Sequence, residues 1–192
     1  MNRIIYSSLV LFLSIFALQT IASAQAAQTV PLYRLFLGDH FYTTNKAERD
    51  SAVQNAGYRD EGIAGYVYAT SQPGTVELRR FVKETNRGTR HYYATTRAEF
   101  VAAQQDGYKS EGACCYVSKE AVNGAVPFYQ LYLKPKNPSG INPAEAYGDD
   151  HLYTTNEKEK YDAINKFQYV IQPTAGYIWT ATYPRPPIRK PQ

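Results

Sequence analysis

The stretch Gly38-Asp39-His40-Phe41-Tyr42-Thr43-Thr44 decides the fold, because it occurs three times along the chain. It returns as His91-Tyr92-Tyr93-Ala94-Thr95 and again as His151-Leu152-Tyr153-Thr154-Thr155. The chain has three histidines, and each one stands at the head of a copy. A random scatter would not place every histidine at the same repeat position, so the sequence predicts three related units.

Each copy lies in a longer unit with the order strand, strand, short helix, strand. In unit 1, residues 31–36, 40–43 and 63–68 are the predicted strands. Residues 45–48 have the side chains of a helix capping box. Gly57 is the expected end of the helix that follows, because glycine adopts the left-handed conformation easily.

The units predict a single domain over residues 30–182, with repeats at about residues 31–70, 75–119 and 126–182. A unit this small cannot bury its apolar face alone, so the copies must share one core. Three copies most simply close into a ring, which hides strand edges. We expect a mainly β fold with short helices (α+β), closed in a pseudo-threefold, three-bladed propeller-like arrangement. A β-trefoil-like fold is the alternative, although trefoil units normally lack a helix between strands, and an open solenoid comes third.

Both ends of the chain are expected to lie outside this domain. Residues 1–24 have the pattern of a signal peptide, with Arg3, an apolar run over residues 4–17 and Ala22-Ser23-Ala24 as the cleavage site. The run is shorter than the roughly 20 residues of a membrane-spanning helix. We therefore expect a secreted or periplasmic protein, free of the membrane after signal cleavage. Residues 183–192 are expected to form a solvated, Pro-rich basic tail.

The charge and the aromatic content narrow the class of partner. The formal net charge is +4, and the basic residues are scattered along the chain outside the tail. This argues against nucleic-acid binding, which usually needs a clustered basic face. The chain has 18 tyrosines against eight phenylalanines and one tryptophan. Tyrosine joins a large apolar ring to a hydroxyl, and it therefore suits both a β-rich core and a sugar-binding surface.

Three stretches of unit 1 carry a resemblance to a known family: Tyr33-Arg34-Leu35-Phe36, the opening motif at residues 38–44, and Glu61-Gly62-Ile63-Ala64-Gly65-Tyr66-Val67. They resemble the repeat of the DUF5648 family, which reads close to YRLYN…GDHFYTT…GY…EGIAGYV. The resemblance covers nearly the whole chain after the signal. It implies a secreted, three-repeat module, often attached to extracellular hydrolases in other proteins, and it brings no activity and no catalytic residues. The chain departs from the pattern at Arg80, Thr89-Arg90, Cys114-Cys115, residues 134–147 and Gln172-Pro173.

The histidines His40, His91 and His151 suggest a metal site, because three imidazoles near one axis make a zinc site with an open position. Neighbouring aspartates could orient two of these imidazoles. Arg90, beside His91, would instead raise the cost of a nearby cation. We prefer the hypothesis that these histidines are structural and hydrogen-bonded. Neither a metal nor a cofactor is therefore expected.

Glu61 and Glu111 could be read as the carboxylate pair of a glycoside hydrolase. That reaction needs two carboxylates in different environments, whereas repeated residues lie in equivalent ones, and unit 3 has Gln172 at this position. The sequence contains no Gly-x-Ser-x-Gly elbow, P-loop or dinucleotide fingerprint. We therefore do not expect an enzyme.

Cys114 and Cys115 are adjacent and are the only two cysteines. Neighbouring Cα atoms are about 3.8 Å apart, short of the usual disulfide range, so a vicinal bridge would be strained. Two readings remain open. The cysteines either form this bridge, as a stiff platform for a ligand, or fill a tight strand where unit 1 has Ala64-Gly65.

The leading hypothesis is a secreted, monomeric, non-catalytic module that binds a carbohydrate or cell-wall polymer. Tyrosines near histidines and carboxylates suit stacking on sugar rings, and three repeats offer up to three similar pockets. The alternatives are a protein-interaction or structural module of the cell exterior and, less favoured, a metal-dependent hydrolase. The candidate ligand-binding residues are His40, Tyr42, Glu61, Tyr66, His91, Tyr93, Glu111, Tyr116, His151, Tyr153 and Tyr177.

Overall fold

The computed structural model of the chain describes residues 28–122, 124–134 and 149–181. The expected signal peptide, the Pro-rich tail and almost all of the insertion at residues 134–147 lie outside these residues. Within the described ranges, no helix has the length and apolar character needed to cross a membrane.

Unit 1 forms a three-stranded antiparallel sheet in which β1 (Val30–Phe36) lies between β2 (His40–Thr43) and β3 (Arg59–Val67). The helix α1 (Lys46–Asn55) connects β2 to β3. The side chain of Asn45 accepts hydrogen bonds from two backbone amides of the first turn and so caps this helix. The predicted order of strand, strand, helix and strand is present.

Unit 2 repeats this order with β4 (Thr75–Thr85), β5 (Gly88–Ala94), α2 (Arg97–Gln105) and β6 (Lys109–Ser118). Thr96 caps α2 in a reciprocal capping box with Glu99. Two short strands, β7 (Val126–Pro127) and β11 (Tyr177–Ile178), extend the sheet to the order β5-β4-β6-β11-β7.

Unit 3 forms the third sheet, in the order β10-β8-β9, from β8 (Tyr129–Leu133), β9 (Asp150–Thr154) and β10 (Val170–Ile171). The helix α3 (Glu157–Phe167) follows β9 and is capped by Asn156. The last strand of the unit, β11, pairs with β6 of unit 2 instead of joining its own sheet.

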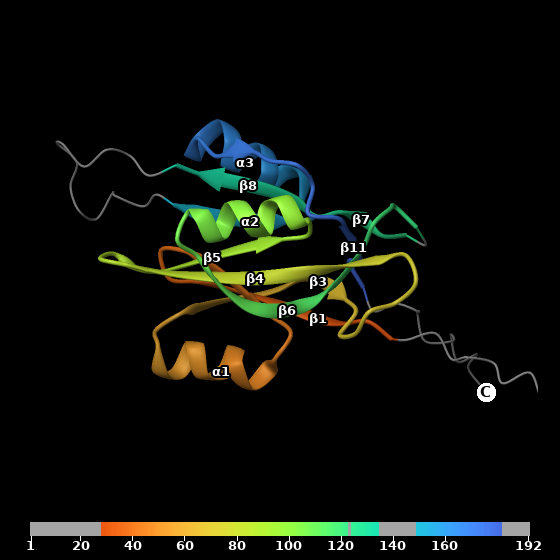
Figure 1. Cartoon of the computed structure of the whole chain (residues 1–192), viewed down its shortest axis with the longest axis horizontal. Coiled ribbons are helices and arrows are strands. Elements are labelled where there is room, and N and C mark those ends of the chain that lie inside the picture. The colour runs from red at the N-terminus through yellow and green to blue at the C-terminus, as the bar shows by residue number, and fades with distance from the viewer. Residues whose placement is uncertain (1–27, 123, 135–148, 182–192) are drawn as a thin grey trace, which may run out of the picture.

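The chain is therefore mainly β with three short helices, as expected. In Figure 1 the strands lie between α1 on one side and α3 on the other. The described strands form three separate sheets and show no closed barrel or propeller. The expected propeller-like closure is thus not found in these residues.

The three sheets meet at their edges around three tyrosines. Tyr42, Tyr93 and Tyr153 come from the edge strands β2, β5 and β9, and each is at most 1% exposed. Neighbouring ring centroids are 5.4–5.5 Å apart with interplanar angles of 78–84°, the edge-to-face geometry that aromatic pairs favour.

The hydroxyl of each tyrosine bonds to the backbone of another. The Tyr42 hydroxyl donates to the carbonyl of Tyr153 (2.7 Å) and accepts from its amide (2.8 Å). The Tyr93 hydroxyl makes the same pair of bonds with Tyr42 (both 2.7 Å), and the Tyr153 hydroxyl with Tyr93 (2.7 and 3.0 Å). The hydroxyls therefore satisfy buried backbone groups at three strand edges that no sheet joins.

We predict that Tyr42→Phe destabilises the fold without changing its core volume much. The substitution leaves the amide and carbonyl of Tyr153 buried and unpaired, at about 1–3 kcal/mol for each group. Urea unfolding should report the loss as a lower midpoint. The control is Tyr161→Phe, at a residue that is 56% exposed, for which we expect a change within about 0.5 kcal/mol. Equal midpoints for both variants would contradict the role of the tyrosine hydroxyls.

Candidate functional site

A cleft of about 670 Å³ lies between unit 1 and unit 3, within the usual range of about 300–1,000 Å³ for small-molecule sites. Its apolar lining consists of Phe36, Leu133, Leu152, Ala163, Phe167 and Tyr169. Its polar lining consists of His40, Arg59, Glu61, Asn156, Lys158, Glu159 and Asp162. The cleft thus joins aromatic and aliphatic walls to a dense set of charged groups.

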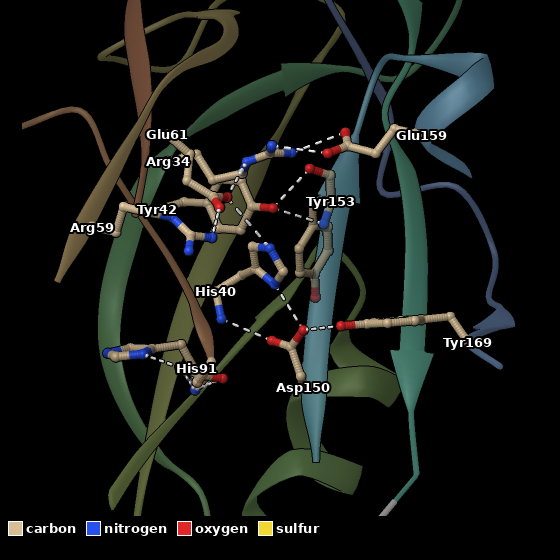
Figure 2. Close-up of polar contacts among 11 residues, drawn as sticks. Arg34, His40, Tyr42, Arg59, Glu61, His91, Asp150, Tyr153, Glu159 and Tyr169 are labelled. Carbon is tan, nitrogen blue, oxygen red and sulfur yellow. Dashed lines mark hydrogen bonds and ion pairs between the residues drawn. The ribbon is translucent and has the colours of Figure 1, made fainter. Parts of the chain in front are cut away.

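His40 lies at the centre of the polar wall, between two carboxylates (Figure 2). Its Nδ1 is 2.7 Å from Oδ2 of Asp150, and its backbone amide donates to Oδ1 of the same residue at 2.7 Å. On the other side, Nε2 lies 3.5 Å from Oε2 of Glu61. The hydroxyl of Tyr169 donates a short hydrogen bond to Asp150 and fixes that carboxylate from behind.

These contacts set the charges of the wall. Burial lowers the pKa of His40, but Asp150 and Glu61 outweigh it and raise the pKa to about 9. The hydrogen bond to His40 lowers the pKa of Glu61 to about 2 against the opposing effect of burial, with help from Arg59 and Arg34. At neutral pH the imidazole is therefore protonated and Glu61 is ionised.

Arg34 ties this wall to α3. Its two terminal guanidinium nitrogens bond to the two carboxylate oxygens of Glu159 at 2.9 and 3.0 Å, and its Nε lies 2.9 Å from Glu61. Arg59 approaches Glu61 to 2.6 Å from the solvent side. Two strands of unit 1 and the first turn of the unit 3 helix are thereby held together by one ionic network.

The contact between unit 2 and unit 1 repeats this network. Nδ1 of His91 is 2.6 Å from Asp39. Arg80 makes a bidentate pair with Glu48 at 2.9 and 3.1 Å, and its Nε lies 2.7 Å from Glu111. Each of these residues holds the same repeat position as its counterpart beside the cleft.

Several side chains distinguish the two contacts: Phe36 and Phe167 of the cleft correspond to Val82 and Ala56, and the residue after the histidine differs as well. The residue after the histidine is Phe41 in unit 1, and its ring packs 4.7 Å from the ring of His91 and 5.6 Å from that of Tyr58. In unit 3 the corresponding residue is Leu152, which lines the cleft beside His40. Leucine is smaller than phenylalanine and leaves room in the cleft beside His40, although the ring of Phe36 lies 4.8 Å from that imidazole.

Among the described residues, the contact between unit 3 and unit 2 has no counterpart of the charged network. Tyr92 packs 4.7 Å from His151, whose Nδ1 has no hydrogen-bond partner among the described residues. Unit 2 has Arg90 at the position where the other units have an aspartate, and Gln130 replaces the arginine of the ionic network. Burial lowers the pKa of His151 to about 4, so this imidazole is neutral at pH 7.

The family model described as a domain of unknown function (DUF5648) matches residues 11–118 and again residues 85–179. The chain belongs to the DUF5648 family. Two overlapping matches of one model are consistent with a repeated unit. No match was found among curated proteins or among solved structures.

The residues that the sequence singled out thus lie in several different settings in this DUF5648 chain. His40 and Glu61 line the cleft, whereas His91 and Glu111 belong to the equivalent network between unit 2 and unit 1. Tyr42, Tyr93 and Tyr153, predicted as ligand contacts, lie in the core and have almost no exposed surface. Tyr66, Tyr116 and Tyr177 lie in β3, β6 and β11, away from the cleft lining, and His151 is enclosed by aromatic rings.

Several residues of the cleft and of its ionic network were not singled out by the sequence: Arg34, Arg59, Glu159, Leu152 and Tyr169. Two of them carried a signal. The arginine recurs in units 1 and 2 of this DUF5648 chain, and the glutamate recurs in every capping box. The recurrence of this arginine and of this glutamate could have suggested that they form ion pairs between units.

His40 and His91 bind aspartates of neighbouring units, whereas His151 packs against Tyr92, so the three imidazoles share no common ligand among the described residues. Within residues 28–122, 124–134 and 149–181, no group of three or more histidine, cysteine or acidic side chains could hold a metal ion. Cys114 and Cys115 are both free thiols. Cys115 is buried in the core, and Cys114 lines a small polar hollow beside Arg80.

We predict that the pKa of His40 lies above the ordinary histidine value in this DUF5648 chain and that the pKa of His151 lies below it. His40 should stay protonated up to about pH 9, and His151 should stay neutral down to about pH 4. Both titrate near 6.5 when unfolded. His40 therefore stabilises the fold below about pH 6.5 and loses this effect as the pH rises through 9. The contribution of His151 to stability is present above about pH 6.5 and lost as the pH falls through 4.

NMR titration of the ring carbons, assigned with His→Asn variants, measures both pKa values. Two midpoints near 6.5 would contradict the prediction.

Proposed function

We propose that this DUF5648 chain is a non-catalytic binding module that holds part of a carbohydrate or cell-wall polymer in the cleft between units 1 and 3. The observation that carries the proposal is the composition of the cleft walls. Phe36, Phe167 and Tyr169 offer aromatic surface of the kind that packs against sugar rings, and the charged wall around His40 offers donors and acceptors for hydroxyls.

The charges of the wall support binding without catalysis. A glycosidase needs a carboxylic acid with a raised pKa to protonate the leaving group. Glu61 has a pKa lowered to about 2, and the pKa of Glu159 is lowered as well because burial is outweighed by Arg34. Both side chains are ionised and bound by arginine, so they serve better as hydrogen-bond acceptors than as acids.

The setting of the module is also part of the proposal. We infer a monomer that is secreted or periplasmic, because the N-terminal sequence has the pattern of a signal peptide. The modest net charge of +4 favours neither nucleic acid nor an anionic membrane surface as the partner.

We further propose that the three units pack about a pseudo-threefold axis through the tyrosine cluster. The support is the cyclic order of the contacts. Each tyrosine hydroxyl bonds to the backbone of another unit, and Asp39 and Asp150 bind His91 and His40 in the same rotational sense. In this arrangement the residue that faces His151 corresponds to the aspartates that bind His40 and His91. Arg90 occupies that position.

The pseudo-threefold arrangement predicts that Arg90→Asp supplies His151 with its missing partner. The pKa of His151 should rise from about 4 toward that of His40, because a carboxylate beside the ring favours the charged form. An NMR titration measures it, with Arg87→Asp at an exposed residue three positions earlier as the control. An unchanged pKa of His151 in a folded Arg90→Asp protein would overturn the arrangement.

Binding in the cleft predicts a specific effect of Leu152→Phe. The added ring should fill the space beside His40, as Phe41 does beside His91, and reduce binding about tenfold or more without removing a charge. A glycan array identifies the ligand and calorimetry measures the affinities. Tyr92→Phe, at the same repeat position of unit 2, is the matched control and should bind as the natural chain does. Absence of binding to every glycan and cell-wall fragment would contradict the proposed function.

One observation favours protein binding as a second candidate. Phe167, Val170 and Ile171 are 62%, 46% and 48% exposed and lie close together in sequence at the end of α3 and in β10. Exposed apolar side chains on an edge strand suit the addition of a partner strand.

A further inference from the structure

A second, more polar hollow of about 300 Å³ adjoins the cleft. The two share Glu61, Asn156 and Glu159 in their walls. The second hollow is lined in addition by Arg34, Ile63, Ala64, Thr154 and Thr155. We call the two adjoining hollows the groove; its aromatic end is the cleft, and its other end carries the two threonines and the Arg34–Glu159 pair.

Each described charge on the groove walls already faces an opposite charge. Arg34 binds Glu61 and Glu159, and Arg59 binds Glu61. At the rim Lys158 lies 2.6 Å from Asp162, and His40 is bound by Asp150. A charged ligand beside Arg34, whose side chain is 16% exposed, would have to displace one of its two carboxylate partners or remain unpaired, and either costs free energy.

A sugar hydroxyl meets no such conflict, because it is both a donor and an acceptor. It can donate to a carboxylate oxygen and accept from a guanidinium without breaking the pair that joins them. The paired charges of these walls therefore favour a neutral ligand over a charged one of the same shape.

We infer that the groove binds an uncharged oligosaccharide of at least two sugar rings. One ring packs in the cleft against the aromatic side chains near His40, and the next lies in the polar hollow beside Thr155. This inference rests on the proposed function, and it names the charge and the minimum length of the ligand.

The contact between units 2 and 1 supports a single groove per chain. It has a polar hollow of about 220 Å³ lined by Arg80, Glu48 and Glu111, equivalent to the hollow beside Thr155. Phe41, packed 4.7 Å from His91, occupies the place where a cleft would continue it. A two-ring ligand therefore fits the contact between units 1 and 3 and does not fit this second contact.

The test compares neutral and charged sugars of one and two rings by calorimetry. The neutral probes are glucose, N-acetylglucosamine, cellobiose, N,N′-diacetylchitobiose and mannobiose, and the charged probes are the deacetylated chitobiose and a disaccharide that contains a uronic acid. We expect one site per chain and a neutral disaccharide that binds at least about tenfold more tightly than its monosaccharide and than the charged probes.

Thr155→Tyr fills the polar hollow and should lower the affinity for the disaccharide to that of the monosaccharide, while monosaccharide binding stays unchanged. Thr44→Tyr, at the equivalent position in the contact between units 2 and 1, is the control and should leave both unchanged. Circular dichroism establishes that both variants fold. Tighter binding of a charged probe, equal binding of one and two rings, or no effect of Thr155→Tyr would overturn the inference and leave carbohydrate binding intact. Failure of every sugar to bind would overturn the proposed function itself.

Discussion

The structure depends on how three strand edges meet in the core without forming a common sheet. β2, β5 and β9 each lie at the edge of their own sheet and would leave buried amides and carbonyls unpaired where they converge. The hydroxyls of Tyr42, Tyr93 and Tyr153 bond to these groups across units. The tyrosine rings therefore fill the hydrophobic core, and their hydroxyls make the hydrogen bonds that strand pairing would otherwise make. These bonds determine which faces of the units lie against one another.

The ionic networks follow from that placement. Once β2 lies against β9, His40 is within reach of Asp150, and Arg34 is within reach of the first turn of α3. The same side chains that join two units then form the polar wall of the cleft. A network of this kind holds its charges rigidly, because each group is bound on more than one side. The proposed binding site is in this sense a by-product of the contact between units, opened by the small side chain of Leu152.

The sequence predicted the parts of this fold that depend on local patterns. The three units, the capped helices and the strand order came from residues at short spacing, such as Asn45 and Glu48. Which atoms meet across units could not be predicted, because the partners are 32 to 125 residues apart, as Arg80 and Glu48 and Arg34 and Glu159 are. For the same reason the tyrosines were predicted to contact a ligand, since neighbouring residues do not reveal that both faces of β2 are buried. The sequence shows that Leu152 stands where the other units have Phe41 and Tyr92, but it does not show that this position lies beside the histidine of another unit.

The aspartates before His40 and His151 each bind the histidine of a different unit. A unit cut out of the chain would therefore lose the partners of its tyrosine hydroxyl and of its histidine. Because the three units are joined in one polypeptide, each contact can carry its own side chains. Arg90 stands where the other units have an aspartate, and Leu152 where they have an aromatic residue, so similar units make contacts that differ in charge and in shape.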